Sequence, residues 1–169
     1  MNKPVILSDL DDTLFQTRRK MVDELDLEPF RPGALDRSMS ARSFMTEEQS
    51  MLVDWLLENA DFIPVTARGT EEISRVTIPF NSWAIATHGA VILTPQGEPD
   101  AEWKAHILDS LAPFRERLLN MQQGITALMA ERKINGWARI NYEYGDTPIY
   151  LVMKHTCLLY TSPSPRDGA

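Results

Sequence analysis

The chain has 169 residues, of which 43% are hydrophobic, with no excess of proline, glycine or charge, so composition alone predicts one ordinary compact domain with a real core. A formal net charge of −7, with acids and bases interspersed, disfavours nucleic acid and anionic membranes as partners, although small anions can still bind locally. The N-terminal apolar stretch is too short for a signal sequence and no window approaches a membrane span, so we expect a cytoplasmic protein.

The first predicted strand is the apolar run at residues 5–7, of the kind buried on both faces of a parallel sheet. It runs directly into Asp9, Asp11 and Asp12. In an extended segment residues two apart face the same side, so Asp9 and Asp11 both project from the carboxyl end of the strand, where open α/β sheets bind ligands. Two close carboxylates can share Mg²⁺, and one can attack while the other moves a proton. The same residues could instead form an Asx turn that caps a surface loop.

The next segment divides into an irregular part and a helix. Residues 14–45 alternate acidic and basic stretches without a clean period, so we predict a loop-rich insertion with short helical pieces. Thr46 and Gln49 form a candidate capping pair for a helix over residues 46–60. We assign the apolar, core-facing side of that helix to four residues: Met51, Leu52, Trp55 and Leu56.

Two more strands are predicted at residues 62–65 and 83–87, with a short helix at 67–76 between them. Glu71 and Glu72 suit the first turn of that helix. Strand, helix, strand, helix, strand is typical of an α/β sheet with right-handed crossovers.

The second half reads as a separate α+β subdomain. A turn, a short strand and another turn around Gly97 lead into an amphipathic stretch at 102–133, which Pro113 kinks or divides into two helices. Residues 137–144 and 147–155 are predicted to form a hairpin. Trp103 either lines a pocket or simply packs, and the same holds for Trp137.

The last thirteen residues, Cys157 to Ala169, break from this pattern. The segment CLLYTSPSPRD resembles a translated sequencing-library adapter, so we exclude 157–169 from fold reasoning as a non-native tail. Cys157 is the only cysteine, so neither a disulfide framework nor a cysteine metal site within the chain is expected. We expect the natural protein to continue beyond His155.

Two segments carry a family resemblance. The stretch VILSDLDDTL resembles the first motif of the haloacid dehalogenase (HAD) superfamily, a hydrophobic strand followed by DxDxT, here Asp9, Asp11 and Thr13. FIPVTAR resembles the second motif, a strand that ends in Thr or Ser, here Thr66. The Thr-Ala-Arg ending and IATHGAVI are similar to segments of the C2-capped, type IIB branch, which includes sucrose-phosphate and trehalose-phosphate phosphatases. The resemblance implies an incomplete Rossmann-like parallel-sheet core over 1–98 and the start of an α+β C2 cap over 99–156.

The resemblance also implies a mechanism for a small phosphorylated metabolite. Asp9 would attack phosphorus and form an aspartyl phosphate, while Asp11 protonates the leaving alcohol and later deprotonates the hydrolytic water. Mg²⁺, the implied cofactor, would be held by the Asp9 carboxylate and the Asp11 backbone carbonyl. The implied phosphate-binding set consists of four residues: Leu10, Thr66, Ala67 and Arg68.

Several assignments around this set stay open. Arg68 either holds substrate or caps the short helix. His88 stands where the family often has asparagine, either as a counterpart of that residue or as a turn histidine that bonds backbone. Gly89 suits a positive φ or a close backbone approach. We expect Thr13 to brace the loop and leave Asp12 out of the catalytic set.

The departures from the family pattern lie after the cap. No segment between Pro99 and His155 fits the third-motif lysine or the fourth-motif acidic pair. We therefore expect an inactive piece of a phosphatase, in which residues 5–7 form an exposed apolar sheet edge. Alternatives are a phosphomutase of the same branch, or a non-catalytic Mg²⁺- or phosphate-binding module with a native tail. The sequence leaves the oligomeric state open.

Overall fold

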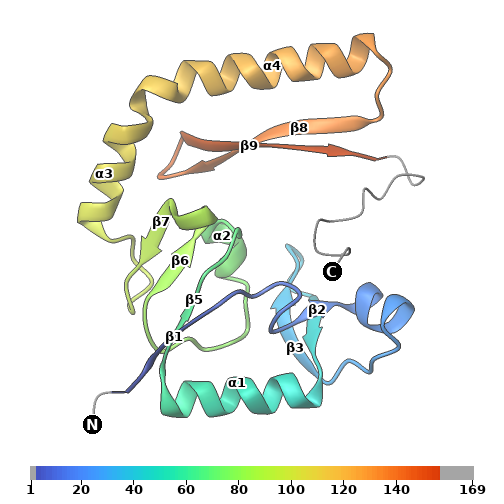
Figure 1. Ribbon diagram of the computed structural model, residues 1–169, viewed down its shortest axis with the longest axis vertical. Helices are drawn as coiled ribbons and strands as arrows, with labels where there is room; N and C mark the ends of the chain where they lie inside the picture. Colours follow the sequence, from blue (N-terminus) through green and yellow to red (C-terminus); the bar gives the residue numbers. More distant parts are fainter. Residues whose placement is uncertain (1–2, 157–169) are drawn as a thin grey trace, which may run out of the picture. The chain divides into compact units, whose positions relative to one another are not determined.

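The computed structural model describes residues 3–156, so the expectations about the tail at 157–169 lie outside the described residues (Figure 1). It is a mixed α/β structure with a small parallel sheet and several antiparallel sheets. The chain divides into two compact units, one ending at Asp109 and the other beginning at Ser110, and each is described by itself. The predicted boundary between residues 98 and 99 stays a prediction.

The parallel sheet contains the first two predicted strands. β1 (Val5–Ser8) pairs in parallel with β5 (Asp61–Pro64), with Val5 opposite Asp61 and Ser8 opposite Pro64. Because β1 has only β5 beside it among the described strands, it is an edge strand. The side chains of Val5 and Leu7 are 63% and 61% exposed, so the prediction of a strand buried on both faces is wrong, whereas the predicted exposed apolar edge is confirmed.

The third predicted strand extends this arrangement. β6 (Ala84–Ala86) is joined to the end of β5 by a parallel bridge between Val65 and Ile85, and it pairs antiparallel with β7 (Val91–Leu93). The short helix between β5 and β6 is α2 (Thr70–Ile73). The predicted turn around Gly97 is confirmed, since its φ is +82°.

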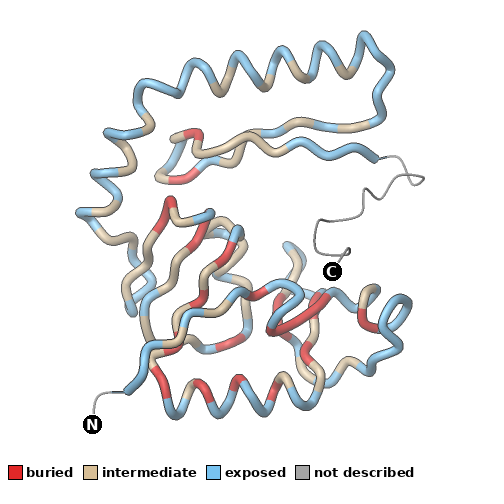
Figure 2. The backbone as a smooth tube through the Cα atoms, in the orientation of Figure 1, coloured by how far each residue is buried: buried red, intermediate tan, exposed pale blue. Residues whose placement is uncertain are grey.

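The helix predicted at residues 46–60 is α1 (Glu47–Asn59), and both hydrogen bonds of the Thr46–Gln49 capping box are present. Its predicted apolar face is wrong in three of four positions. The exposed fractions are 67% for Met51, 50% for Leu52 and 56% for Trp55. The buried residues of the helix are Ser50, Val53 and Leu56 (Figure 2). The strands that pack against α1 are β5 and, from the neighbouring antiparallel sheet, β4, and they cover only a narrow stripe of the helix, so the apolar side chains beside that stripe stay exposed.

Residues 14–45 form a sheet where a loop-rich insertion was predicted. β2 (Gln16–Thr17), β4 (Ala41–Met45) and β3 (Arg31–Leu35) lie in that order and pair antiparallel. The predicted helical piece is a five-residue π-helix at Lys20–Glu24. The period was hidden because register shifts interrupt the pairing of β3 on either side of Ala34.

One hydrophobic cluster supports the first unit. It brings together the loop after β1, the antiparallel sheet, α1 and β5. Its buried members are Leu10, Leu14, Phe15, Ala34, Met45, Val53, Leu56, Phe62 and Ile78.

The elements after β7 match the predictions closely. α3 (Ala101–Leu111) is separated from α4 (Arg115–Glu131) by a 3₁₀ turn that contains Pro113. β8 (Gly136–Glu143) and β9 (Thr147–His155) form the predicted hairpin, and Gln122 of α4 donates to the carbonyl of Ala138 at 3.2 Å. Among residues 3–156, no helix is long and apolar enough to cross a membrane.

Candidate functional site

The loop after β1 is a tight turn anchored by one buried side chain. Leu10 is fully buried, and its carbonyl accepts hydrogen bonds from the backbone N–H groups of Thr13, Leu14 and Phe15 at 3.3, 2.9 and 3.3 Å. The neighbours on either side, Asp9 and Asp11, are exposed. The Leu10 N–H donates to Asp9 Oδ1 at 2.8 Å. The buried leucine therefore fixes the loop and leaves both carboxylates at its surface.

The carboxyl end of β5 lies directly beside this loop. The Val65 N–H donates to the Ser8 carbonyl at 2.8 Å, which joins the ends of β1 and β5. The next residue, Thr66, is buried, and its N–H donates to the Ile85 carbonyl at 2.9 Å. Thr66 Oγ1 accepts from the N–H of Arg68 at 3.1 Å. A hydroxyl that accepts one bond can still donate its proton, which is the role that phosphate binding would require of Thr66.

Arg68 bridges the two loops. Its Nε and Nη2 donate to Oδ2 and Oδ1 of Asp11, each at 2.7 Å, so the pair is bidentate. The guanidinium carbon lies 5.2 Å from the ring centroid of Phe15, and the arginine side chain is 17% exposed while that of Asp11 is 50% exposed. The hydrogen bonds to Asp11 raise the pKa of Arg68, against the opposing effect of burial. The bidentate contact therefore fixes the Arg68 guanidinium against the Asp11 carboxylate.

The sequence left two roles open for Arg68, and capping of α2 is not what the structure shows. The carboxylate of Glu72 accepts from the N–H of Gly69 at 3.2 Å at the start of that helix. The contact between Arg68 and Asp11 was not predicted. The signal was available: Asp11 follows β1 by three positions and Arg68 follows β5 by four, and the ends of adjacent parallel strands meet at one edge of the sheet.

A third loop, which follows β6, is hydrogen-bonded to the loop after β5. His88 donates its backbone N–H to the Thr66 carbonyl at 3.1 Å, and Thr87 donates to the Arg68 carbonyl at 2.8 Å. The φ values of Thr87, His88 and Gly89 are +52°, +55° and +89°, so the predicted positive φ of Gly89 is confirmed. Both roles considered for His88 stay predictions.

The same loops also contain Ala67, Asp12 and Thr13. Ala67 is exposed beside Thr66. Asp12 has a φ of +62° and pairs with Lys20 at 2.8 Å. Gln49 donates to the Thr13 carbonyl at 2.9 Å, so the loop is braced through the backbone of Thr13. Because its carboxylate pairs with Lys20, Asp12 stays outside the proposed catalytic set.

The donor atoms at this edge fit Mg²⁺ in type. Asp9 supplies an exposed carboxylate and Asp11 a backbone carbonyl two residues away, both hard oxygen donors. In the described range, 3–156, no three His, Cys, Asp or Glu residues gather into a metal-binding group. Mg²⁺ commonly keeps several waters and uses only one or two protein carboxylates, so a site with two protein ligands is compatible with it.

Comparison with known proteins adds no assignment. No protein-family model matches the chain, and no curated protein matches it either. The motifs and the geometry of the sheet edge therefore carry the functional argument.

Proposed function

We propose that this chain carries the nucleophile-bearing part of a Mg²⁺-dependent phosphatase of the HAD superfamily, type IIB branch. Its substrate would be a sugar phosphate or a similar small phosphomonoester. A Rossmann-like core and the start of a C2 cap belong to the same proposal. One observation carries it: the Val65–Ser8 hydrogen bond places the aspartate loop beside Thr66 at the carboxyl edge of the parallel sheet.

The proposed chemistry has two steps. The Asp9 carboxylate attacks phosphorus, the bond to the leaving oxygen breaks, and Asp11 gives that oxygen a proton. Water then attacks the aspartyl phosphate, Asp11 takes the proton from the water, and phosphate leaves with Asp9 regenerated. Thr66 donates to a phosphoryl oxygen. Mg²⁺, held by the Asp9 carboxylate and the Asp11 carbonyl, would offset the repulsion between carboxylate and phosphate.

The bidentate contact of Arg68 gives this proposal a further element. A carboxylate bound through both oxygens is poorly placed to exchange a proton, so Asp11 must lose at least one of these bonds before it acts. A phosphate dianion offers the guanidinium a second bidentate acceptor of equal fit. We therefore assign Arg68 two successive partners, first Asp11 and then the substrate phosphate.

Beryllium fluoride, which adds to a carboxylate as a mimic of a phosphoryl group, tests the nucleophile. The 169-residue chain is mixed with Mg²⁺ and beryllium fluoride, and bound fluoride is followed by fluorine NMR. We expect a bound signal for the unaltered chain and its loss in Asp9→Asn. Asp12→Asn is the matched control, because it removes the same charge from the same loop and asparagine tolerates a positive φ. An unchanged signal in Asp9→Asn would show that the nucleophile assignment is wrong.

Turnover is tested on the protein read from its locus past His155. With Mg²⁺ and a panel of sugar phosphates, Asp9→Asn should lower the rate of hydrolysis by roughly 10³-fold or more, about 4 kcal/mol of barrier. Product analysis separates loss of phosphate to water from transfer within the substrate, which a phosphomutase would perform.

A non-catalytic Mg²⁺- or phosphate-binding module is the second candidate. The observation that favours it is the Arg68–Asp11 pair, which occupies the carboxylate that an enzyme would need for proton transfer. Resequencing the locus past His155 separates the two. A frame that continues into a lysine and an acidic pair supports the enzyme, and an early stop codon supports the module.

A further inference from the structure

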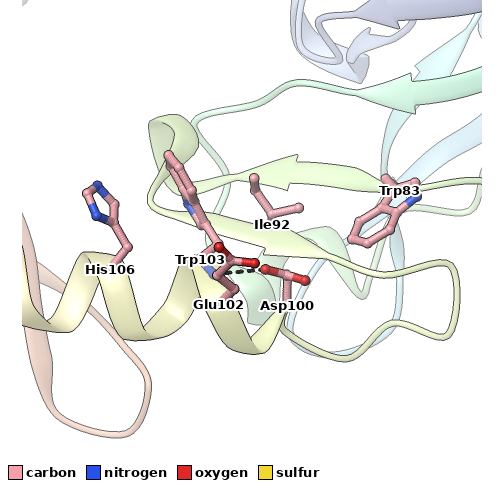
Figure 3. Close-up of a pocket in the computed structure, with 6 residues that line it drawn as sticks. All are labelled: Trp83, Ile92, Asp100, Glu102, Trp103 and His106. Carbon is pink, nitrogen blue, oxygen red and sulfur yellow. Dashed lines mark hydrogen bonds between the residues drawn. The ribbon is translucent and has the colours of Figure 1, made fainter.

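A concave site lies in the first unit, and none of its lining residues belongs to the candidate site described above. It has a volume of about 580 Å³ and lies between the β6–β7 hairpin and the first turns of α3. Its lining residues are Trp83, Ile92, Asp100, Glu102, Trp103 and His106 (Figure 3).

The walls of this pocket are aromatic and one of them is fixed in place. Trp103 donates its indole N–H to the Gly89 carbonyl at 2.9 Å, and its ring lies 5.3 Å from that of His106, centroid to centroid. Trp83 lies across Ile92 from Trp103 (Figure 3). Trp83 is 40% exposed, so part of its ring is open to a ligand. The pocket thus offers two indole surfaces with an apolar floor between them, and the fixed one has little entropy left to lose on binding.

The charge of the pocket is negative. Asp100 and Glu102 are carboxylates, and none of the described residues that line the pocket is a lysine or an arginine. Asp100 Oδ1 accepts from the N–H of Trp103 at 2.8 Å, at the start of α3. The positive end of a helix is worth about half a charge, which offsets only a fraction of the two carboxylates. A phosphate would therefore be repelled here, and a cation attracted.

We propose that this pocket binds a small organic cation, an amine or quaternary ammonium that carries an apolar group. The apolar group would lie on Ile92 between the two indoles, and the charged nitrogen would lie near Glu102 and Asp100. The indoles would shield the apolar group from water, and the two carboxylates would attract the positive nitrogen. The inference uses none of the residues of the proposed phosphatase site and stands or falls separately from it.

A series of three probes with one shared ring tests the charge preference: benzylammonium, benzyl alcohol and benzoate. Each is titrated into the full 169-residue chain, and the indole N–H signals are followed by proton–nitrogen NMR. We expect benzylammonium to shift the signals of Trp83 and Trp103 in a saturable way. The indoles of Trp55 and Trp137, which do not line the pocket, are internal controls and should stay in place.

The variant Glu102→Gln tests the charge directly. It should raise the dissociation constant of benzylammonium about threefold and leave that of benzyl alcohol unchanged. Glu58→Gln, on the exposed side of α1, removes the same charge elsewhere and should have no effect. Retained signal dispersion in both variants shows that they fold. The proposal is overturned if benzylammonium gives no saturable shift, if benzoate or benzyl alcohol binds as tightly, or if the two variants behave alike.

Discussion

Two apolar surfaces of the first unit differ in what covers them. Beneath the loop after β1, Leu10 and Phe15 are fully buried and Leu14 is 3% exposed. On β1 itself, Val5 and Leu7 are more than 60% exposed (Figure 2). The two groups are equally apolar and only a few residues apart. Burial is therefore decided by the elements that pack over a residue, and not by the local sequence.

This difference bears on the site. The exposed carboxylates of Asp9 and Asp11 belong to the loop whose buried side chains, Leu10, Leu14 and Phe15, we call the packed base. Their positions are therefore set by packing as well as by hydrogen bonds. Among the described strands only β5 pairs with β1, so the other edge of β1 is, by contrast, a surface on which another strand could pair. Substitutions in the packed base should cost far more stability than substitutions of equal size on the open surface.

The largest effect is expected for Phe15→Ala. The ring is fully buried and also lies under the Arg68 guanidinium, so its removal should lower the free energy of unfolding by about 3–5 kcal/mol. Trp55→Ala is the control at an exposed apolar side chain of α1, since Trp55 is 56% exposed, and should cost about 0.5 kcal/mol or less. Urea unfolding measures both. Equal losses would contradict the contrast between buried and exposed apolar side chains.

Much of the fold could be predicted from the sequence where the signal is local. The capping pair of α1, the break at Pro113 and the β8–β9 hairpin depend on residues close together in the chain, and all three are confirmed. The face that α1 buries was wrong because it depends on the width of the sheet beneath it. The β2–β4–β3 sheet was missed because its pairing joins strands across bulges and a π-helix.

In the candidate site, too, the features with a local sequence signal could be predicted, and those that depend on contacts between distant residues could not. Asp9 and Asp11 could be placed at the carboxyl end of a parallel strand from the sequence, and the family resemblance added Thr66. The contact of Arg68 with Asp11 depends on side-chain conformation across two loops, and no local pattern encodes that. The Mg²⁺ site and the catalytic roles stay predictions.

A smaller effect should follow from adding one methyl group against the packed base. In Gly33→Ala, the new Cβ would lie 2.6 Å from Phe15 Cβ, so the strand or the ring must move. Overpacking of this kind costs about 1–3 kcal/mol. In the control, Gly124→Ala, the new Cβ meets nothing within 4 Å in the middle of α4, and alanine should stabilise that helix by up to about 1 kcal/mol. Amide hydrogen exchange in β3 and in α4 reads out the two changes, and destabilisation in both would contradict the packing argument.

The ion pair of Arg68 and Asp11 should contribute less to the free energy of unfolding than the buried side chains of the packed base. A double-mutant cycle with Arg68→Met and Asp11→Asn isolates the pair, for which we expect a coupling of about 0.5–1 kcal/mol, discounted because Asp11 is half exposed. The reference is the pair of Arg31 and Asp54, with side chains 32% and 57% exposed, which should couple more weakly. Urea unfolding measures both cycles. A stronger coupling in the reference pair would show that Phe15 adds nothing beneath Arg68.

The smallest effect is expected for the ion pair between Arg75, whose side chain is 14% exposed, and Glu71, whose side chain is 62% exposed. Arg75 donates to both carboxylate oxygens of Glu71, at 3.1 and 2.9 Å, and this lowers the pKa of Glu71. Because the pKa is lower in the folded state, the pair stabilises the fold above the ordinary glutamate value of about 4.3. That stabilisation disappears as the pH falls through the folded value. The difference in unfolding free energy between the unaltered chain and Glu71→Gln should therefore shrink from about pH 7 to about pH 3 in urea titrations. A difference that grows on acidification would contradict the lowered pKa of Glu71, since it would mean that the folded protein favours the protonated carboxyl.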